Sequence, residues 1–258
     1  MTSKPLPSVR SLAIKVPEVT AYFWIIKVLS TTVGETFADY LNETLGFGLS
    51  KTSLVMTIAL LALLFVQVRS KKYIPVLYWG TVVLMSITGT LLTDNLTDSI
   101  GVSLFISSGF FALALAATFL LWRREEGTLD INSIDTRRRE IFYWFVILFT
   151  FSLGTASGDL ISEKLNLGYG NALLLFIAAI GLIAALWRFR AFGAITAFWA
   201  TYIMTRPLGA SIGDFMSQAK KDGGLGIGTT NTSYIFLAAI LALVAYLTIS
   251  KRDVIEYP

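Results

Sequence analysis

The sequence predicts an all-α membrane protein with eight transmembrane helices, arranged as four tandem two-helix repeats. Hydrophobic residues make up 55% of the 258 residues and charged residues only 15%, against roughly 45–50% and 25% in soluble domains. Apolar runs of about 20 residues, the length that crosses a bilayer, recur along the chain, and one spacing of Trp, Gly and Asp occurs four times. Short connections between the runs leave a single membrane domain, residues 1–258.

The apolar runs define the expected spans and the side of the membrane on which each connection lies. The spans are expected at 19–41, 52–69, 73–94, 102–122, 140–162, 171–188, 192–214 and 233–250. The repeats are expected at 15–71, 72–122, 140–190 and 191–250, with 123–139 as a cytoplasmic linker. Basic residues gather before the first span, at Lys4, Arg10 and Lys15, and after each even-numbered span. The positive-inside rule then predicts a multi-pass protein of the plasma (inner) membrane with both termini in the cytoplasm.

The composition also excludes several kinds of function. The chain has no His and no Cys, which removes disulfides, thiol nucleophiles and the usual zinc ligands. The net charge of +4 comes from residues that serve as topology signals, so no nucleic-acid partner is expected. ASGD (156–159) and SIGD (211–214) place Gly before Asp as intramembrane aspartyl proteases do, but neither completes the G-x-G-D motif. We therefore expect neither an enzyme nor a cofactor.

Each odd-numbered span carries Trp, then Gly ten residues later, then Asp five residues after the Gly. The four sets are Trp24, Gly34 and Asp39; Trp79, Gly89 and Asp94; Trp144, Gly154 and Asp159; and Trp199, Gly209 and Asp214. Four sets in one register indicate a true internal repeat. Because each repeat has two spans, the repeats are parallel and equivalent residues lie at equal depth.

This register predicts four parallel helical hairpins around a pseudo-fourfold axis, with the odd-numbered helices inside. The third, seventh, eleventh and fifteenth residues after Trp share one helix face, and that face carries most of the polar residues. The Gly lies at its edge, where a small residue lets a neighbouring helix approach closely. The Asp lies about 22 Å beyond the Trp, near the outer boundary of the membrane. The even-numbered spans are almost wholly apolar and are expected to face lipid.

The chain resembles a family of bacterial integral membrane proteins, often called membrane-anchored proteins. The family is defined by four tandem repeats of unknown function, each with two transmembrane regions and a characteristic Trp. The resemblance is close at KVPEVTAYFWIIKVLSTTVGETFADYLN (15–42) and weaker in the other repeats, but it covers nearly the whole chain. It implies the architecture given above and brings no activity with it.

Three ionisable residues fall inside predicted spans: Lys27, Glu35 and Arg206. Charged groups inside a bilayer are costly unless they face a partner or water, so they mark candidate functional sites. Glu35 and Arg206 are expected one helical turn apart in depth, where they could form a structural ion pair or a gate in which a substrate cation displaces Arg206. An anion held by Lys27 and Arg206 is a further alternative.

The four Asp residues predict a ring of carboxylates at the outer end, which is either a cation site or a set of caps on helix ends and loops. Oxygen ligands would favour Mg²⁺, Ca²⁺ or Mn²⁺, with Thr31, Thr90 and Thr155 as auxiliary ligands. Na⁺ and protons remain open. The four Trp residues could anchor the helices at the interface, plug the axis or stack on a cation, and we favour the anchor.

The sequence thus predicts a secondary transporter or channel-like protein for a small inorganic cation, with Asp39, Asp94, Asp159, Asp214 and Glu35 as cation ligands. Lys27 and Arg206 would supply counter-charge. The alternative is a scaffold or sensor whose polar axis only holds the repeats together. The identity of the ion, the energy coupling and the oligomeric state are not encoded in any pattern that we recognise.

Overall fold

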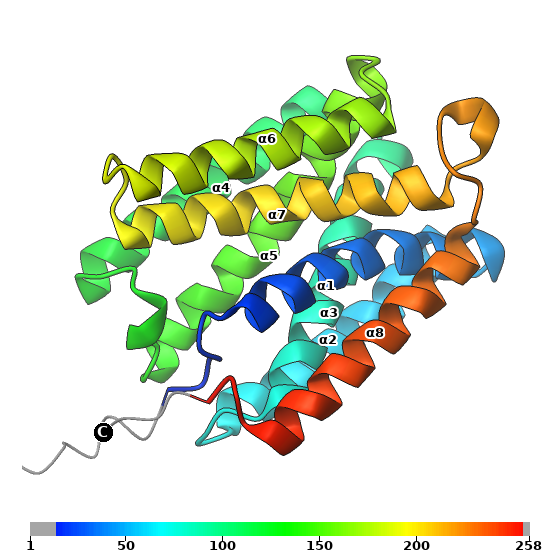
Figure 1. The fold of residues 1–258 in the computed structure, drawn as a ribbon. Coiled ribbons are helices and arrows are strands. Elements are labelled where there is room, and N and C mark those ends of the chain that lie inside the picture. The colour runs from blue at the N-terminus through cyan, green and yellow to red at the C-terminus, as the bar shows by residue number, and fades with distance from the viewer. Residues whose placement is uncertain (1–13, 255–258) are drawn as a thin grey trace, which may run out of the picture.

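The computed structural model describes residues 14–254, which form eight α-helices joined by short connections (Figure 1). The predicted all-α fold with eight helices is confirmed. The helices are α1 (Ala21–Asp39), α2 (Leu49–Arg69), α3 (Pro75–Asp94), α4 (Leu104–Glu126), α5 (Arg137–Asp159), α6 (Tyr169–Arg188), α7 (Ala194–Ser217) and α8 (Thr229–Ser250). Lys4 and Arg10, which contributed to the predicted orientation, lie outside the described residues.

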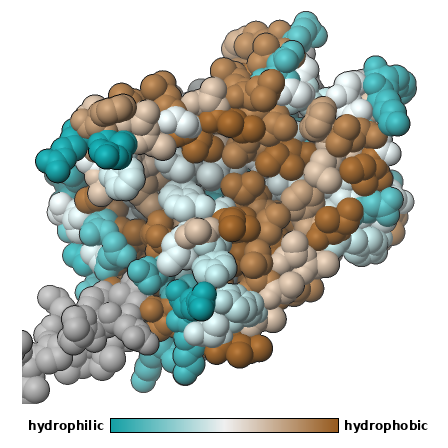
Figure 2. Space-filling model, in the orientation of Figure 1, coloured by the Kyte–Doolittle hydropathy of each residue, from teal (hydrophilic) through white to brown (hydrophobic). Residues whose placement is uncertain are grey.

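Six of the eight described helices are long and apolar enough to cross a membrane. By helix length and hydropathy the chain is therefore a multi-pass membrane protein. The other two helices, α1 and α7, contain the buried charges Lys27, Glu35 and Arg206. Figure 2 shows the matching surface: apolar residues cover the middle of the face drawn, and hydrophilic residues gather towards its ends.

Burial separates the odd-numbered helices from most of the even-numbered ones. The most apolar segment of α3 is 67% buried and that of α5 is 61% buried, whereas the corresponding segments of α2 and α6 are each 11% buried. The odd-numbered helices contact one another in the closed order α1, α3, α5, α7 and back to α1. They form the interior of the bundle.

The even-numbered helices pack in an order that the sequence analysis did not anticipate. α2 packs mainly on α3, α4 on α5, α6 on α7 and α8 on α1. The second helix of each repeat thus packs on the first helix of the following repeat, and the last repeat closes on the first. The expectation of four packed helical hairpins is wrong in this respect, because each repeat completes its neighbour.

The repeated glycines are the closest contacts in the ring of odd-numbered helices. A Cβ atom on Gly34 would lie 1.9 Å from Ser86 Oγ, and one on Gly209 would lie 1.7 Å from Thr31 Oγ1. Gly89 meets Phe151 and Gly154 meets Arg206 in the same way. In every case the Gly touches the seventh residue after the Trp of the next helix. This confirms that the Gly permits close helix approach, and it gives all four interfaces one geometry.

Three of the odd-numbered helices continue past the repeated Asp in a five-residue π-helical turn. These turns are Tyr40–Thr44, Asn95–Ser99 and Leu160–Lys164. In the fourth repeat α7 continues to Ser217 as an α-helix and is followed by extended backbone. The Asp residues therefore lie within continuous helix, one turn before the chain leaves the bundle.

Candidate functional site

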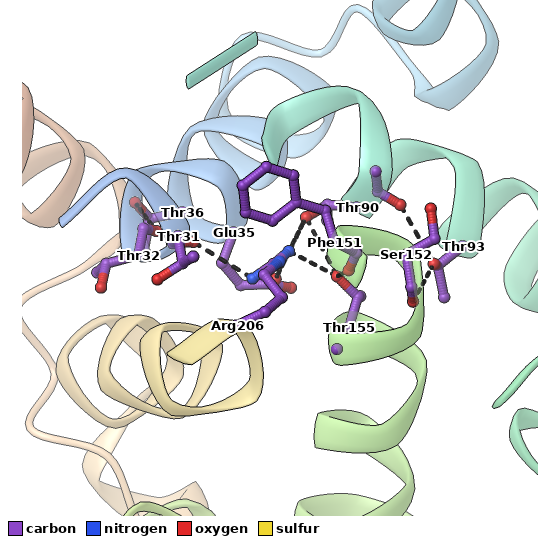
Figure 3. Close-up of polar contacts among 12 residues, drawn as sticks. Thr31, Thr32, Glu35, Thr36, Thr90, Thr93, Phe151, Ser152, Thr155 and Arg206 are labelled. Atoms are coloured by element: carbon purple, nitrogen blue, oxygen red, sulfur yellow. Dashed lines mark hydrogen bonds and ion pairs between the residues drawn. The ribbon is translucent and has the colours of Figure 1, made fainter. Parts of the chain in front are cut away.

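The centre of the bundle is occupied by the guanidinium group of Arg206, which is fully buried (Figure 3). Its Nη2 lies 3.0 Å from Glu35 Oε2 and donates hydrogen bonds to the hydroxyls of Thr90 and, at 2.5 Å, Thr155. Its Nη1 donates to the backbone carbonyl of Thr31 at 3.3 Å. We call these five residues the central network.

The central network joins all four repeats. Glu35, Thr90 and Thr155 are the eleventh residues after the Trp of the first three repeats, and Arg206 is the seventh residue after the Trp of the fourth. The predicted Glu35–Arg206 ion pair is formed. Removing either partner would leave an uncompensated charge in the interior. The pair therefore has a structural role, because it joins α1 and α7.

One residue from each repeat also lines a cavity of about 270 Å³ at the end of the bundle beyond Glu35. Asp39, Asp94, Asp159 and Asp214 all contribute to its wall, and Glu35 lies between it and Arg206. Asp94 is within electrostatic range of Glu35 and of the other carboxylates around it. We call this the acidic end. The four Asp residues, which are equally placed in the repeats, therefore lie together in the structure. The cavity wall also includes two carboxylates that the repeat did not indicate, Glu43 and Asp98.

At the first two positions the Asp side chain does not cap the π-helical turn that follows it. Asp39 and Asp94 have α-helical backbone angles and make no side-chain capping hydrogen bond to the π-helical turn that follows. In the described part of the chain, no group of three or more carboxylates is arranged to hold a metal ion. The acidic end is thus a wide negative cavity rather than a tight chelating site.

Lys27 lies deeper in the bundle and is also fully buried. Its Nζ lies 4.3 Å from the centre of the Phe151 ring and 4.2 Å from the centre of the Tyr202 ring. The Phe151 ring also faces the guanidinium carbon of Arg206 at 5.8 Å. The sequence analysis placed Lys27 on the polar face but assigned no role to the two aromatic residues that surround it.

Beyond Lys27 the axis is filled by aromatic side chains. Trp79, Trp144 and Trp199 are buried in the bundle, and Trp24 is partly buried. The favoured interpretation of the Trp residues as interfacial anchors is therefore wrong for three of the four. They belong to a packed set of rings, the aromatic layer, whose other members are Phe23, Tyr78, Trp122, Tyr143, Phe198 and Tyr202.

Two polar contacts hold the chain segments around the aromatic layer. Lys15 Nζ lies 2.7 Å from Glu140 Oε2, and both side chains are nearly inaccessible to solvent. The hydroxyl of Tyr73 donates to Asp253 Oδ2 at 2.5 Å. The aromatic layer and these two pairs together form the aromatic end. The sequence analysis missed both pairs, and treated Lys15 only as a topology signal.

The comparisons with known proteins agree with the internal repeat. Four segments match the family model described as Repeat of Unknown Function (DUF347), at residues 22–73, 77–128, 142–191 and 197–253. No curated protein and no solved structure matches the chain. The four matched segments cover most of the sequence, and the chain belongs to the family of proteins built from DUF347 repeats.

Proposed function

We propose that this protein binds a small inorganic cation at the acidic end and moves it along the axis between the odd-numbered helices. All eight helices cross the membrane in this proposal, with both termini in the cytoplasm and the acidic end outside. The four odd-numbered helices surround a pseudo-fourfold axis. Mg²⁺, Ca²⁺, Mn²⁺, Na⁺ and protons are the candidate ions.

The low hydropathy of α1 and α7 is compatible with spanning. Lys27, Glu35 and Arg206 are all buried inside the bundle, so none of these charges would meet lipid. Each of the two helices packs against two other odd-numbered helices. Charged residues that face the interior of a helix bundle are typical of transport proteins. The basic connections after the even-numbered helices support the cytoplasmic placement of the termini.

The observation that carries the proposal is the convergence of seven acidic residues on one cavity: the five predicted ligands, Asp39, Asp94, Asp159, Asp214 and Glu35, together with Glu43 and Asp98. Carboxylates around a concave wall concentrate cations by their summed field. A cavity of this size holds several water molecules. We therefore expect a cation to enter with part of its hydration shell, which agrees with the absence of a three-carboxylate chelating group among the described residues.

Glu35 gives this cavity a connection to the centre of the bundle. It lines the cavity and pairs with Arg206 at 3.0 Å. A cation that reaches Glu35 competes with Arg206 for the same carboxylate. Once released, the guanidinium group keeps its hydrogen bonds to Thr90 and Thr155. Glu35 is thus the deeper coupling carboxylate and Arg206 its exchangeable counter-charge.

The proposal is tested by thermal unfolding of the detergent-purified protein in the chlorides of Na⁺, Mg²⁺, Ca²⁺ and Mn²⁺ at several pH values. A ligand that binds only the folded state raises the unfolding temperature in a saturable manner. We expect one ion to do so in the wild type and in Glu18→Gln, which removes an exposed carboxylate outside the cavity. The shift should be lost in Asp39→Asn and Asp214→Asn. Equal shifts in all four proteins, or none in any, would refute a site at the acidic end.

A non-transporting scaffold or sensor is the second candidate, and one observation favours it. The Arg206 guanidinium group satisfies four acceptors from three other helices without any ligand. A purely structural axis predicts that the Asp39→Asn and Asp214→Asn variants change the unfolding temperature equally with and without cations. Flux measurements in liposomes with the stabilising ion then separate a transporter from a sensor that binds the ion and does not move it.

A further inference from the structure

The second half of α6 is exposed at a position where the other even-numbered helices are buried. The four helices align on a residue near their start that is buried in each of them: Thr52, Ser107, Ala172 and Thr232. Fifteen residues later, the residue is also buried in three of the helices: Gln67, Trp122 and Leu247. In α6 this residue is Trp187, which is 54% exposed. The inner face of α6 is therefore covered at its start and uncovered towards the aromatic end.

The exposed part of α6 also leaves Trp24 of α1 partly uncovered. In the cyclic order of the helices, α6 stands to α1 as α4 stands to α7. Phe119 and Trp122 of α4 pack edge-on against Trp199 of α7, with ring centres 5.1 and 5.7 Å apart. The residue of α6 that aligns with Phe119 is Ala184, which is exposed. A methyl group thus stands where α4 supplies an aromatic ring, and Trp24 is the repeated Trp that is only partly buried.

The missing side chains leave a groove of about 380 Å³ between α6, α7 and α1, which follow one another across the face drawn in Figure 1. Its walls include the rings of Trp24, Trp187 and Phe198 and the aliphatic side chain of Ile180. The corresponding hollow between α2, α3 and α5 measures about 190 Å³. An apolar cavity of about 150 Å³ already holds a benzene-sized molecule. The groove beside α6 therefore has room for a longer apolar chain.

Two arginines border this groove where α6 ends and α7 begins. Trp187 near the end of α6 and Ala194 at the start of α7 both line the groove. Between them in the chain lie Arg188, the last residue of α6, and Arg190, and both are exposed. Arginine binds phosphate through paired hydrogen bonds, and Trp is common at the level of the lipid headgroups. The groove thus combines an apolar wall with a basic border at one end.

We propose that the groove binds an acyl chain of a phospholipid whose anionic headgroup lies against Arg188 and Arg190. α6 is long and apolar enough to cross the membrane, so a groove along its exposed side opens to lipid. The bound chain takes the place that Phe119 and Trp122 fill beside α4, and it joins α6 to α1 where the last repeat meets the first. The inference requires only that the bundle lies in a bilayer, and it is independent of the proposed cation function.

The first experiment follows thermal unfolding of the delipidated full-length protein in detergent. Dioleoyl phosphatidylglycerol, dioleoyl phosphatidylcholine and glycerol phosphate are titrated separately. We expect a saturable rise in the unfolding temperature with phosphatidylglycerol. Phosphatidylcholine should need a concentration higher by about fivefold for each arginine that contacts the headgroup, and glycerol phosphate should have no effect. Equal responses to the two lipids, an equal response to glycerol phosphate, or no saturable response to phosphatidylglycerol would each overturn the inference.

A matched pair of variants places the lipid in the groove. Ala184→Phe supplies the ring that α4 has at the aligned position, whereas Ala178→Phe adds the same ring at an exposed position of α6 outside the groove. We expect Ala184→Phe to lose the saturable response to phosphatidylglycerol and Ala178→Phe to keep it. Thr201→Leu fills the groove from α7 and replaces Ala184→Phe should that variant not fold. An unchanged response in the folded groove variant would overturn the site.

The headgroup contact and the alternative occupant are tested in the same preparation. Replacing Arg188 and Arg190 together by Gln should abolish the preference for phosphatidylglycerol over phosphatidylcholine. Arg69→Gln, which removes an exposed arginine at the same end of α2, should keep the preference. Equal preference in both variants would overturn the headgroup assignment. Light scattering of the delipidated protein gives its mass: two chains in the wild type and one in Ala184→Phe would mean that a second copy occupies the groove, and would also overturn the inference.

Discussion

The two ends of the odd-numbered helices are built from the same four repeats but have opposite physical character. At the acidic end, each repeat contributes one Asp to the wall of a cavity. About 22 Å away along each helix, three of the four repeated Trp residues are buried in the aromatic layer and leave little space. Repetition produces a ring at each depth, and the residue type at that depth decides whether the ring is a cavity or a plug.

The comparison also shows where the symmetry is broken. At the acidic end all four repeated residues are Asp, whereas at the centre the repeats supply Glu35, Thr90, Thr155 and Ala210. Arg206 reaches across from one turn earlier and meets the first three. In the proposed function, the four equal Asp residues concentrate the cation. The unequal residues at the centre leave one pair, Glu35 and Arg206, to respond to it.

The largest expected effect comes from removing the Glu35–Arg206 ion pair, which lies between the two ends. Glu35→Ala leaves Arg206 charged and unpaired in the interior, and we expect a loss of about 3–5 kcal/mol in the free energy of unfolding. Denaturant unfolding in mixed micelles measures it. Adding Arg206→Met to Glu35→Ala removes the orphaned charge and should recover a large part of the loss. A double variant less stable than Glu35→Ala would contradict the ion-pair explanation.

The close approach of α5 and α7 can be tested with a matched pair of glycines. A Cβ atom on Gly154 would lie 2.2 Å from Arg206 Cγ, whereas one on Gly181 in α6 would meet nothing within 4 Å. We expect Gly154→Ala to cost about 1–3 kcal/mol through overpacking. Gly181→Ala should gain about 0.5–1 kcal/mol from reduced backbone entropy. The same assay applies, and equal effects at the two positions would argue against close helix contact.

Substitutions at the two ends should differ in sign and in salt dependence. Asp94→Asn removes one of several neighbouring negative charges, so we expect stability to stay constant or rise, and more so at low salt. Tyr143→Phe removes the hydrogen bond to Tyr78 and should cost about 0.5–1.5 kcal/mol at any salt concentration. Unfolding midpoints at low and high NaCl measure both. A salt-independent loss in Asp94→Asn would mean that its carboxylate is structural.

The smallest effect concerns pH at the aromatic end. Burial raises the pKa of the Asp253 carboxyl above the ordinary value of 3.8. The protonated form therefore favours folding: this contribution is fully present below the ordinary value and is lost as the pH rises through the value in the folded protein. Wild type should lose slightly more stability than Asp253→Asn between acidic and neutral pH. Identical pH profiles of the unfolding temperature would show that Asp253 does not titrate in this way.

Most of the correct predictions from the sequence came from the internal repeat. Equal register places equal residues at equal depth, so the shared cavity of the four Asp residues and the close contacts of the four Gly residues followed from spacing alone. The Glu35–Arg206 pair followed because few charges lie inside the spans. Hydropathy shows which helices are apolar but not which neighbour they cover, so the packing of α2 on α3 was not foreseen.

Contacts outside the register could not be predicted. Lys15 and Glu140 are 125 residues apart and occupy no repeated position, so no periodic signal joins them. The burial of Trp79, Trp144 and Trp199 was missed because Trp near a helix end is also typical of the membrane interface. Phe151 and Tyr202 were on the predicted polar face, but an aromatic ring there indicates packing as readily as contact with an ammonium group.

The closure of α8 on α1 and of α7 on α1 has a consequence for how the protein is made. Synthesis delivers α1 first, with Lys27 and Glu35 already in place, while Arg206 and the covering helix α8 arrive last. If α1 crosses the membrane as proposed, its charges must be sheltered from lipid until α7 and α8 complete the ring. We expect truncated chains that end before α7 to be retained by the insertion machinery or degraded, and a circularly permuted gene that begins at α3 to assemble the same ring.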